Sequence, residues 1–470
     1  MKRRWIEAAT ILMTVGVIGL TGCGMNSTAS QNPLSSPVTP PLTVATSPHG
    51  EAFGGQQPVS GMSLQLYAVG STGYGSAATA LFAAPTLTTA TGGFSFPAYT
   101  CPSASTQVYL VGTGGDPVAG NAGAGGSTAA NANLALMVPL GSCGNLNSGT
   151  HIHMNELTTV AAVWALAPFM SGTATSYLNV GTSSTNATGL QLAFAASSEV
   201  VNTSTGTFPG TLPTGATLPT PELNTLADVL EACINSKGGV ANDGSTTCGS
   251  LFGFTPDSTG TNFPTDTITA AMNMALNPSR NVTALNNLVG GTPAFEPDLG
   301  TAPNAWTVAI QYTGGGLNQP KTIAADPSGN IWVGNTGSQA VSLFDNLGNS
   351  KLGTTGTVLG GTPGGIATDL ALPTANAWVT SSDNKVYELN SAGMNTNTFT
   401  LNGLNLPTAI AIDPSGVIWI TNSASGANSV SAFTSTGGVL SGSPFSVAGI
   451  ASPVGIAING AANASCANCK

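Results

Sequence analysis

This sequence has very little charge. Asp, Glu, Lys and Arg make up 6% of its 470 residues, against roughly 25% in an ordinary soluble domain. Disordered chains combine few apolar residues with high charge, whereas 41% of the residues here are hydrophobic. The chain is therefore expected to fold, with a surface made polar by Gly, Ser, Thr and Asn. Such a surface also predicts a stability that changes little between neutral and mildly acidic pH.

Positive charge is the scarcest kind. The chain has nine Lys and Arg, three of them within its first four residues, and its formal net charge is -10. Binding to phosphate backbones requires clustered cations, so no nucleic-acid partner is expected. Histidine is also rare, with three residues in total and none after His153.

One apolar run stands at the amino terminus. Lys2, Arg3 and Arg4 precede the apolar stretch 8–20, which is followed by Leu20-Thr21-Gly22-Cys23. A basic flank, a short apolar core and small residues indicate a signal peptide and not a spanning helix. The tetrapeptide resembles the lipobox of bacterial lipoproteins, which implies cleavage before Cys23 and lipid on its sulfur. A secretory signal with a chance cysteine is the alternative.

The lipobox resemblance also implies a location. Residues 1–22 are predicted to be the signal peptide, and 23–52 a flexible Ser/Thr/Pro-rich linker. Two or more acyl chains hold a protein stably at a bilayer, so the membrane is an expected partner. Gly24 stands where lipoproteins kept at the inner membrane often carry Asp. We therefore predict a lipid-anchored protein of the bacterial cell envelope, periplasmic or surface-exposed, with the outer membrane favoured.

Without Cys23, an even set of six cysteines remains. In an oxidising compartment they should pair. We predict the disulfides Cys101–Cys143 and Cys233–Cys248, because each pair lies within one predicted domain. Cys466 and Cys469 form a C-x-x-C that could be an additional pair. That motif alone is half a zinc site, and it lacks the strand-to-helix setting of a redox site.

Residues 53–145 have the pattern of a β-sandwich. The segments 63–67, 94–96 and 107–111 alternate apolar and polar residues between Gly-rich turns, as half-buried strands do. The run Gly55-Gln56-Gln57-Pro58-Val59-Ser60-Gly61, with Gly92-Gly93-Phe94 later, resembles the prealbumin-like or carboxypeptidase-regulatory-like repeat. That resemblance implies a sandwich domain that serves as a spacer or adhesive module.

Residues 146–300 are predicted to form a small α-helical domain. Residues 155–170 are apolar nearly all round, which is typical of a buried helix. Thr220-Pro221 and Pro264-Thr265-Asp266 are helix starts with Pro in or before the first turn. A further short helix is expected over 281–289.

Residues 301–470 contain an internal repeat. Pro320 and Pro407 begin two nearly matching sixteen-residue motifs, and related segments begin near Pro363 and Pro453, at intervals of 43, 44 and 46 residues. A period in the forties suits one four-stranded propeller blade per repeat. The motifs resemble NHL-type and streptogramin-lyase-like propellers. The whole chain is thus predicted to be a mainly β multidomain protein ending in a β-propeller.

The motif divides into structural units. Ile-Ala-Ile is expected to be an inner strand, Asp-Pro-Ser-Gly a turn and Ile-Trp-Ile the next strand, with the tryptophan packed between adjacent blades. In the last repeat, Ser465 stands where tryptophan is expected, and the sequence ends in mid-blade. The repeat region is therefore predicted to be a truncated copy or open fragment, unless residues 306–312 add a strand that closes a ring of four.

The lyase resemblance implies a histidine base and a carboxylate-held magnesium. No histidine occurs from 154 to 470, and Asp369, Asp383 and Glu388 are scattered. Asp326 and Asp413 stand in the Asp-Pro-Ser-Gly turns, where turn formation is their ordinary role. The repeat region alone therefore predicts no catalytic centre.

The remaining histidines are weak metal candidates. His151 and His153 alternate in an expected strand, so both imidazoles could face one metal ion, although a solvated strand end is favoured. We predict that the chain is not an enzyme, uses no cofactor, and is a binding or structural module for an unknown protein or carbohydrate. The alternatives are a streptogramin-lyase-like or lactonase-like propeller enzyme and a truncated copy without independent function.

Overall fold

A computed structural model gives the fold. The predicted signal peptide with Cys23, most of the linker, and Cys466 and Cys469 lie outside the residues that it describes. The described residues are 42–44, 47–117, 130–172, 178–369, 375–401, 403–446 and 449–458.

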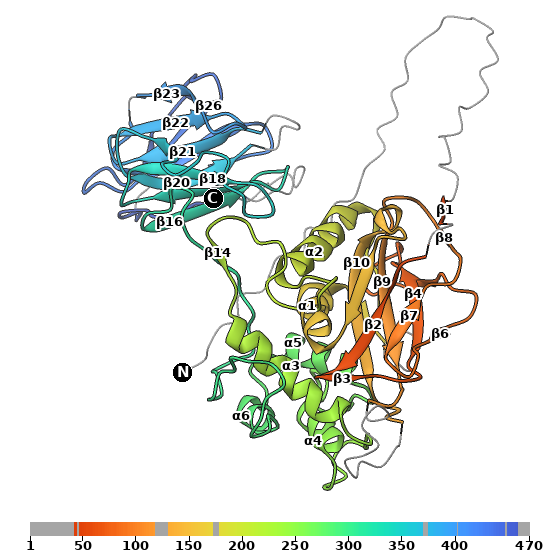
Figure 1. Ribbon diagram of the computed structural model, residues 1–470. Coiled ribbons are helices and arrows are strands. Elements are labelled where there is room, and N and C mark those ends of the chain that lie inside the picture. Colours follow the sequence, from red (N-terminus) through yellow and green to blue (C-terminus); the bar gives the residue numbers. More distant parts are fainter. Residues whose placement is uncertain are drawn as a thin grey trace, which may run out of the picture. The chain divides into compact units, whose positions relative to one another are not determined.

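The protein is mainly β, and its amino-terminal half is built around a five-stranded antiparallel sheet (Figure 1). Strand β4 alternates half-buried and buried residues as its sequence predicts. In β9, residues 107–112 are all buried, so this strand is covered on both faces. The strands are β4 (Ser63–Ala68), β5 (Thr79–Ala80), β6 (Thr86–Leu87), β9 (Gln107–Thr113) and β10 (Ala135–Ser142).

A second sheet joins distant parts of this half. Strand β11 pairs in parallel with β2, and β3 and β7 pair with β2 in antiparallel fashion. Four buried aromatic rings, from Phe82, Phe94, Phe96 and Tyr99, pack beside these strands. The strands are β2 (His49–Gly54), β3 (Gln57–Pro58), β7 (Gly93–Ser95) and β11 (His151–Met154), with β1 (Leu42–Val44) and β8 (Tyr99–Cys101) forming a separate pair.

The helices follow the sheets along the chain. The four predicted helices are present, and the side chains of Asn155 and Asp266 cap two of them as their sequence positions suggest. Two others, α2 and α4, were not predicted, because both interrupt their apolar spacing with Gly, Ser and Thr. The helices are α1 (Glu156–Leu166), α2 (Ala187–Val200), α3 (Thr220–Ile234), α4 (Thr247–Phe254), α5 (Thr267–Leu276) and α6 (Val282–Asn286).

Sheets and helices share one hydrophobic core. Helices α1, α2 and α5 pack against β10, and the buried cluster runs without a break from Ala52 to Trp306. Buried residues on both sides of position 146 belong to it. The domain boundary near that position stays a prediction.

Both predicted cysteine pairs lie at disulfide distance. Cys101 and Cys143 have Cα atoms 5.9 Å apart, and those of Cys233 and Cys248 are 4.4 Å apart. All four side chains are fully buried. Disulfides persist in oxidising compartments, so these pairs fit an extracytoplasmic protein. None of the helices in the described ranges has the length and apolar character needed to cross a bilayer.

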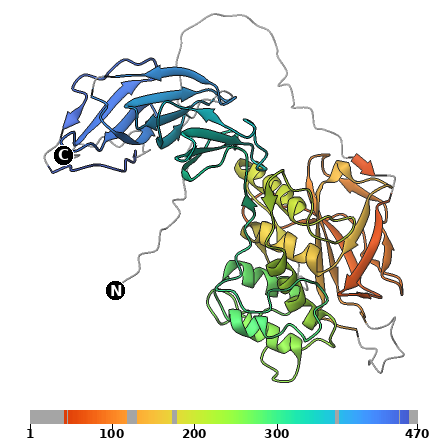
Figure 2. The ribbon, with the colours of Figure 1, turned by 60° about the vertical axis from the view of Figure 1, so that its left-hand side comes forward.

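Three four-stranded antiparallel sheets occupy the described part of residues 313–458 (Figure 2). Each joins consecutive strands in order, as the repeat predicts, and β16, β20 and β24 lie next to one another. We call them repeat sheets 1, 2 and 3. Sheet 1 is β16 (Pro320–Ala325), β17 (Ile331–Asn335), β18 (Ala340–Phe344) and β19 (Thr357–Val358). Sheet 2 is β20 (Pro363–Thr368), β21 (Ala377–Ser381), β22 (Lys385–Leu389) and β23 (Asn395–Phe399). Sheet 3 is β24 (Pro407–Ile412), β25 (Val417–Asn422), β26 (Ser429–Thr434) and β27 (Phe445–Ser446).

The repeat tryptophans pack between sheets, as predicted. Trp332 of sheet 1 shares a buried cluster with Ala377 and Val379 of sheet 2. Trp378 of sheet 2 shares the next cluster with Ile418 and Ile420 of sheet 3. These two clusters hold the three sheets together.

The ends of the repeat region differ from a closed ring. Strand β15 (Gln311–Tyr312) pairs with β14 (Ala216–Thr217) and not with sheet 3. Residues 453–458, the described beginning of the predicted fourth repeat, form no strand. The Pro453 carbonyl accepts a hydrogen bond from Thr408 Oγ1 at 3.1 Å, so this segment lies beside β24.

Candidate functional site

The repeat aspartates fix the turns and also hold the tryptophans. Asp326 Oδ1 accepts hydrogen bonds from the backbone N–H groups of Ser328 and Asn330, and Oδ2 accepts from Trp332 Nε1 at 3.1 Å. Asp413 Oδ2 accepts from Trp419 Nε1 at 2.9 Å in the same way. The turn role is confirmed. The bond to the indole was missed, although the fixed six-residue spacing of Asp and Trp in both motifs is a signal for it.

The other acidic candidates of the repeat region form hydrogen bonds or ion pairs with nearby residues of the same region. Asp383 Oδ2 accepts from Tyr387 Oη at 2.7 Å and pairs with Lys385 Nζ at 3.0 Å. Asp369 Oδ1 accepts from the Asn376 backbone, and Glu388 Oε1 from the Asn376 side chain at 2.7 Å. No three His, Cys, Asp or Glu side chains in the described ranges gather into a metal-binding group. The residues present do not fit the magnesium site that the lyase resemblance implies.

The three histidines lie together on strands β2 and β11. His151 lies opposite His49, with ring centroids 5.3 Å apart, and His153 lies opposite Glu51. His153 Nδ1 is 3.0 Å from Glu51 Oε1, and its ring stacks on Phe53. His151 Nδ1 is 2.9 Å from the Ser204 carbonyl. The shared face predicted for His151 and His153 is present, with one nitrogen of each ring held by a protein partner.

Two acidic side chains are buried on the helices, one on α1 and one on α3. Glu156, at the start of α1, is fully buried, and both of its carboxylate oxygens accept from the Gly55 backbone N–H, at 2.8 and 3.0 Å. Burial raises its pKa to about 8. Asp228 of α3 accepts from the backbone N–H groups of Ala294 and Phe295, and burial raises its pKa to about 7. The burial of these two side chains could not be predicted from the sequence, because their hydrogen-bond partners are backbone groups far along the chain.

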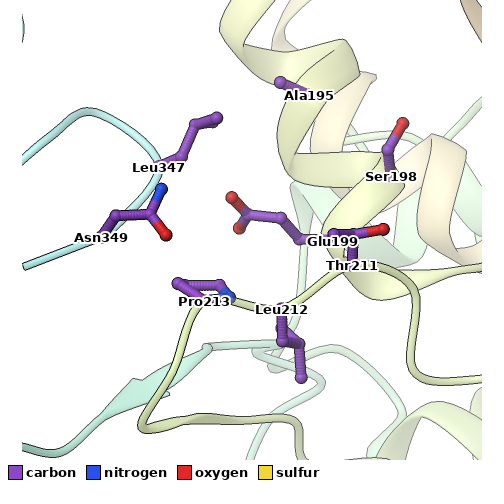
Figure 3. A pocket seen from close by; sticks show the side chains of 8 residues that line it. All are labelled: Ala195, Ser198, Glu199, Thr211, Leu212, Pro213, Leu347 and Asn349. Atoms are coloured by element: carbon purple, nitrogen blue, oxygen red, sulfur yellow. The ribbon is translucent and has the colours of Figure 1, made fainter.

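A cavity of about 370 Å³ surrounds another carboxyl group (Figure 3). Glu199 from α2 points into it, toward Asn349 of the turn that follows β18. Burial, with a smaller contribution from Asp345, raises the Glu199 pKa to about 7. Leu212, Pro213 and Leu347 make the rest of its wall largely apolar.

A second cavity, of about 460 Å³, has no charged residue in its described lining, and most of its lining residues carry hydroxyl or amide side chains. We call it the hydroxyl pocket. The described residues that line it come from the end of β4 and the residues after it, from β5, from the β8–β9 loop and the start of β9, from residues 182–184, and from the first turns of α2. None of them is charged. Ten carry hydroxyl or amide side chains: Ser71, Thr79, Ser103, Ser105, Thr106, Gln107, Thr182, Ser183, Ser184 and Gln191.

A disulfide and several hydrogen bonds hold the walls of the hydroxyl pocket in place. The Cys101–Cys143 disulfide ties down the β8–β9 loop, and the backbone N–H of Gly144 donates to the Ala104 carbonyl at 2.9 Å. Gln107 Nε2 donates to Ser142 Oγ at 3.0 Å. Thr182 is buried, and its hydroxyl has no partner among the described residues. An unsatisfied buried hydroxyl is costly, which marks this wall as a place where a ligand or water would be stabilised.

Comparisons with known proteins give structural neighbours only. No protein-family model matches, and no curated protein matches. One solved structure, a catalytically inactive virginiamycin B lyase from Staphylococcus aureus with quinupristin, is 15% identical with a TM-score of 0.25. It aligns over 28% of this chain and 44% of its own. A streptogramin B lyase is 20% identical with a TM-score of 0.27, over 32% of this chain and 48% of its own. The chain spans less than half the length of each.

This comparison corrects one sequence-based prediction. The chain was expected not to be an enzyme, because no histidine lies in the repeat region. That prediction is contradicted by the comparison, in which three of the solved structures similar to the chain are streptogramin B or virginiamycin B lyases. The error came from treating a missing base in one region as evidence about the whole protein, although buried carboxyl groups such as Glu199, with its pKa near 7, can also exchange protons.

Proposed function

We propose that this chain is a lipid-anchored protein of the bacterial cell envelope that binds a neutral saccharide in the hydroxyl pocket. The observation that carries the proposal is the lining of that pocket, with ten hydroxyl or amide side chains and no charged side chain among the described residues. The repeat sheets are proposed to be NHL-type propeller blades displayed by the same anchor.

The chemistry of the lining favours sugar hydroxyls. Hydroxyl and amide side chains both donate and accept hydrogen bonds, as the hydroxyl groups of a saccharide do. A charged ligand would lose its hydration here without gaining an ion pair. The volume of about 460 Å³ lies within the usual range for small-molecule sites. Ala187 and Leu190 add an apolar patch for the C–H face of a sugar ring.

A bulky side chain at the pocket wall should abolish this binding. Ala187 is exposed and lines the pocket, so Ala187→Trp should occlude it without disturbing the core. Isothermal titration with maltose, cellobiose and the disaccharide of N-acetylglucosamine should show binding of at least one to the unchanged protein. The affinity of the variant for that sugar should fall at least about tenfold.

Thr188→Trp is the matched control. Thr188 is the next residue of the same helical turn and is exposed, but it does not line the pocket. This variant should bind the sugar as the unchanged protein does. Binding of none of the three sugars, or equal binding by both variants, would reject the saccharide proposal.

The anchoring part rests on the lipobox-like tetrapeptide, and the two disulfides support it because they fit an exported protein. In cells fed radiolabelled palmitate, the protein should be labelled and should pellet with membranes. Cys23→Ser should lose the label and leave the pellet, whereas Cys466→Ser should keep both. Label retained after Cys23→Ser would show that Cys23 is not the modified residue.

A further inference from the structure

All three histidines of the chain lie on one face of the parallel pair β2–β11. His49 comes from β2, and His151 and His153 come from β11, which lies far along the chain. The pairing register sets His151 beside His49 and His153 beside Glu51. Residues two apart on a strand point to the same side, so the three imidazoles share the outer face, where side chains are exposed or half-buried. A chain with three histidines in 470 residues thus has all of them at one place.

The hydrogen bonds of the two β11 rings fix their tautomers. His151 Nδ1 is 2.9 Å from the Ser204 carbonyl, and His153 Nδ1 is 3.0 Å from Glu51 Oε1. A carbonyl or carboxylate oxygen only accepts, so Nδ1 donates in both neutral rings and the lone pair lies on Nε2. Metal-binding histidines have the same arrangement, because a hydrogen bond at the other nitrogen fixes the tautomer and orients the ring. Both rings therefore have the tautomer that binds a metal ion through Nε2.

His49 and His151 are spaced for one metal ion. Their ring centroids are 5.3 Å apart. A metal–nitrogen bond of about 2 Å places the ion roughly 3 Å from the centre of a ring, so two rings that share a tetrahedral ion have centres about 5 Å apart. Because His49 is exposed, its ring can turn toward the ion without disturbing the core.

His153 is held by other contacts. Its ring stacks on Phe53, with centroids 5.2 Å apart. A Cβ atom added to Gly206 would lie 2.1 Å from His153 Cδ2, the ring atom next to Nε2, so this edge of the ring faces the Gly206 backbone. No three His, Cys, Asp or Glu side chains in the described ranges form a metal-binding group. The protein therefore supplies two ligands, and His153 is not one of them.

We propose that His49 and His151 bind one divalent transition-metal ion on the outer face of β2 and β11. Imidazole is a ligand of Cu²⁺, Ni²⁺ and Zn²⁺, and Cu²⁺ forms the most stable complexes of the divalent first-row series. Two protein ligands leave the other coordination positions to water or to a second molecule, so the site is open. The proposal does not depend on the hydroxyl pocket, because no histidine lines that pocket.

Titration of the full chain with Cu²⁺ alone is the test, in a non-ionic detergent under non-reducing conditions and without a polyhistidine tag. Calorimetry should show one ion bound per chain, with a dissociation constant on the order of micromolar. Electron paramagnetic resonance should show coupling of the bound Cu²⁺ to two imidazole nitrogens. His49→Ala and His151→Ala should each weaken binding at least about tenfold and leave coupling to one imidazole nitrogen.

His153→Gln is the matched control, because His153 lies on the same strand and face but is held by Glu51 and Phe53. This variant should bind Cu²⁺ as the unchanged protein does, and circular dichroism spectra should be alike for all four proteins. An unchanged protein that binds no Cu²⁺ would overturn the proposal, and the contact between His49 and His151 would then be an edge-to-face ring contact alone. An equal loss in His153→Gln, or no loss in His49→Ala, would overturn it too.

Discussion

Trp332→Ala should lower the free energy of unfolding of the repeat sheets by about 3–5 kcal/mol, the usual cost of truncating a buried aromatic residue to alanine. Trp332 is 0% exposed and fills the space between sheets 1 and 2. Its loss leaves a cavity and removes the Nε1 hydrogen bond to Asp326. Urea denaturation followed by circular dichroism should show the corresponding transition at lower urea concentration.

Trp419→Ala is the matched comparison for Trp332→Ala. The two residues hold the same repeat position and make the same bond to an aspartate, but Trp419 is half-buried. Its replacement should cost about half as much or less, because less apolar surface returns to water. Equal losses for the two variants would show that the Asp–Trp bond, and not packing between the sheets, stabilises the repeat.

The repeat region was the most predictable part of the fold. Similar motifs occur at a nearly constant interval, so strand, turn and tryptophan positions could be assigned by comparing the sequence with itself. The Asp326–Trp332 bond was missed, because turn formation already accounts for the aspartate, although the fixed spacing of Asp and Trp in both motifs is a signal for it.

The hydroxyl pocket was beyond prediction from sequence. Its lining comes from separate segments between residues 68 and 191, and Ser and Thr are too common in this chain to mark any position. Helix α2, which forms one wall, was also missed, because Gly189 and several Ser and Thr obscure its apolar spacing. The disulfide beside it was predictable because Cys101 and Cys143 lie within one predicted domain.

The scarcity of charge suggested that stability would vary little with pH, and the buried carboxyl groups change that expectation. Burial raises the pKa of Glu156 from 4.5 to about 8 and that of Asp228 from 3.8 to about 7. Burial also raises the pKa of Glu222 and Glu231. The pH dependence of stability is therefore determined by where the few acidic residues lie, and not by their number. Their shifts all act in one direction, because an ionised carboxylate is penalised by burial.

The protein should melt at a higher temperature at pH 5 than at pH 8. A raised pKa means that the folded state binds the proton more tightly than the unfolded state does. The contribution to stability is therefore fully present below about pH 4.5 and is lost as the pH rises toward 8. Each pKa unit corresponds to about 1.4 kcal/mol, so Glu156 alone accounts for a change on the order of several kcal/mol across this range.

Glu156→Gln should flatten this pH dependence. The amide is neutral at every pH, and its oxygen can still accept from the Gly55 backbone N–H. The variant should therefore be more stable than the unchanged protein at pH 8, with a much smaller difference at pH 4.5. Asp243→Asn is the control, because Asp243 is exposed and hydrogen bonds led by that from Thr246 lower its pKa, so it stays ionised between pH 5 and 8. A melting temperature that rises with pH in the unchanged protein, or a slope that Glu156→Gln leaves intact, would show that Glu156 is already ionised in the folded state at neutral pH.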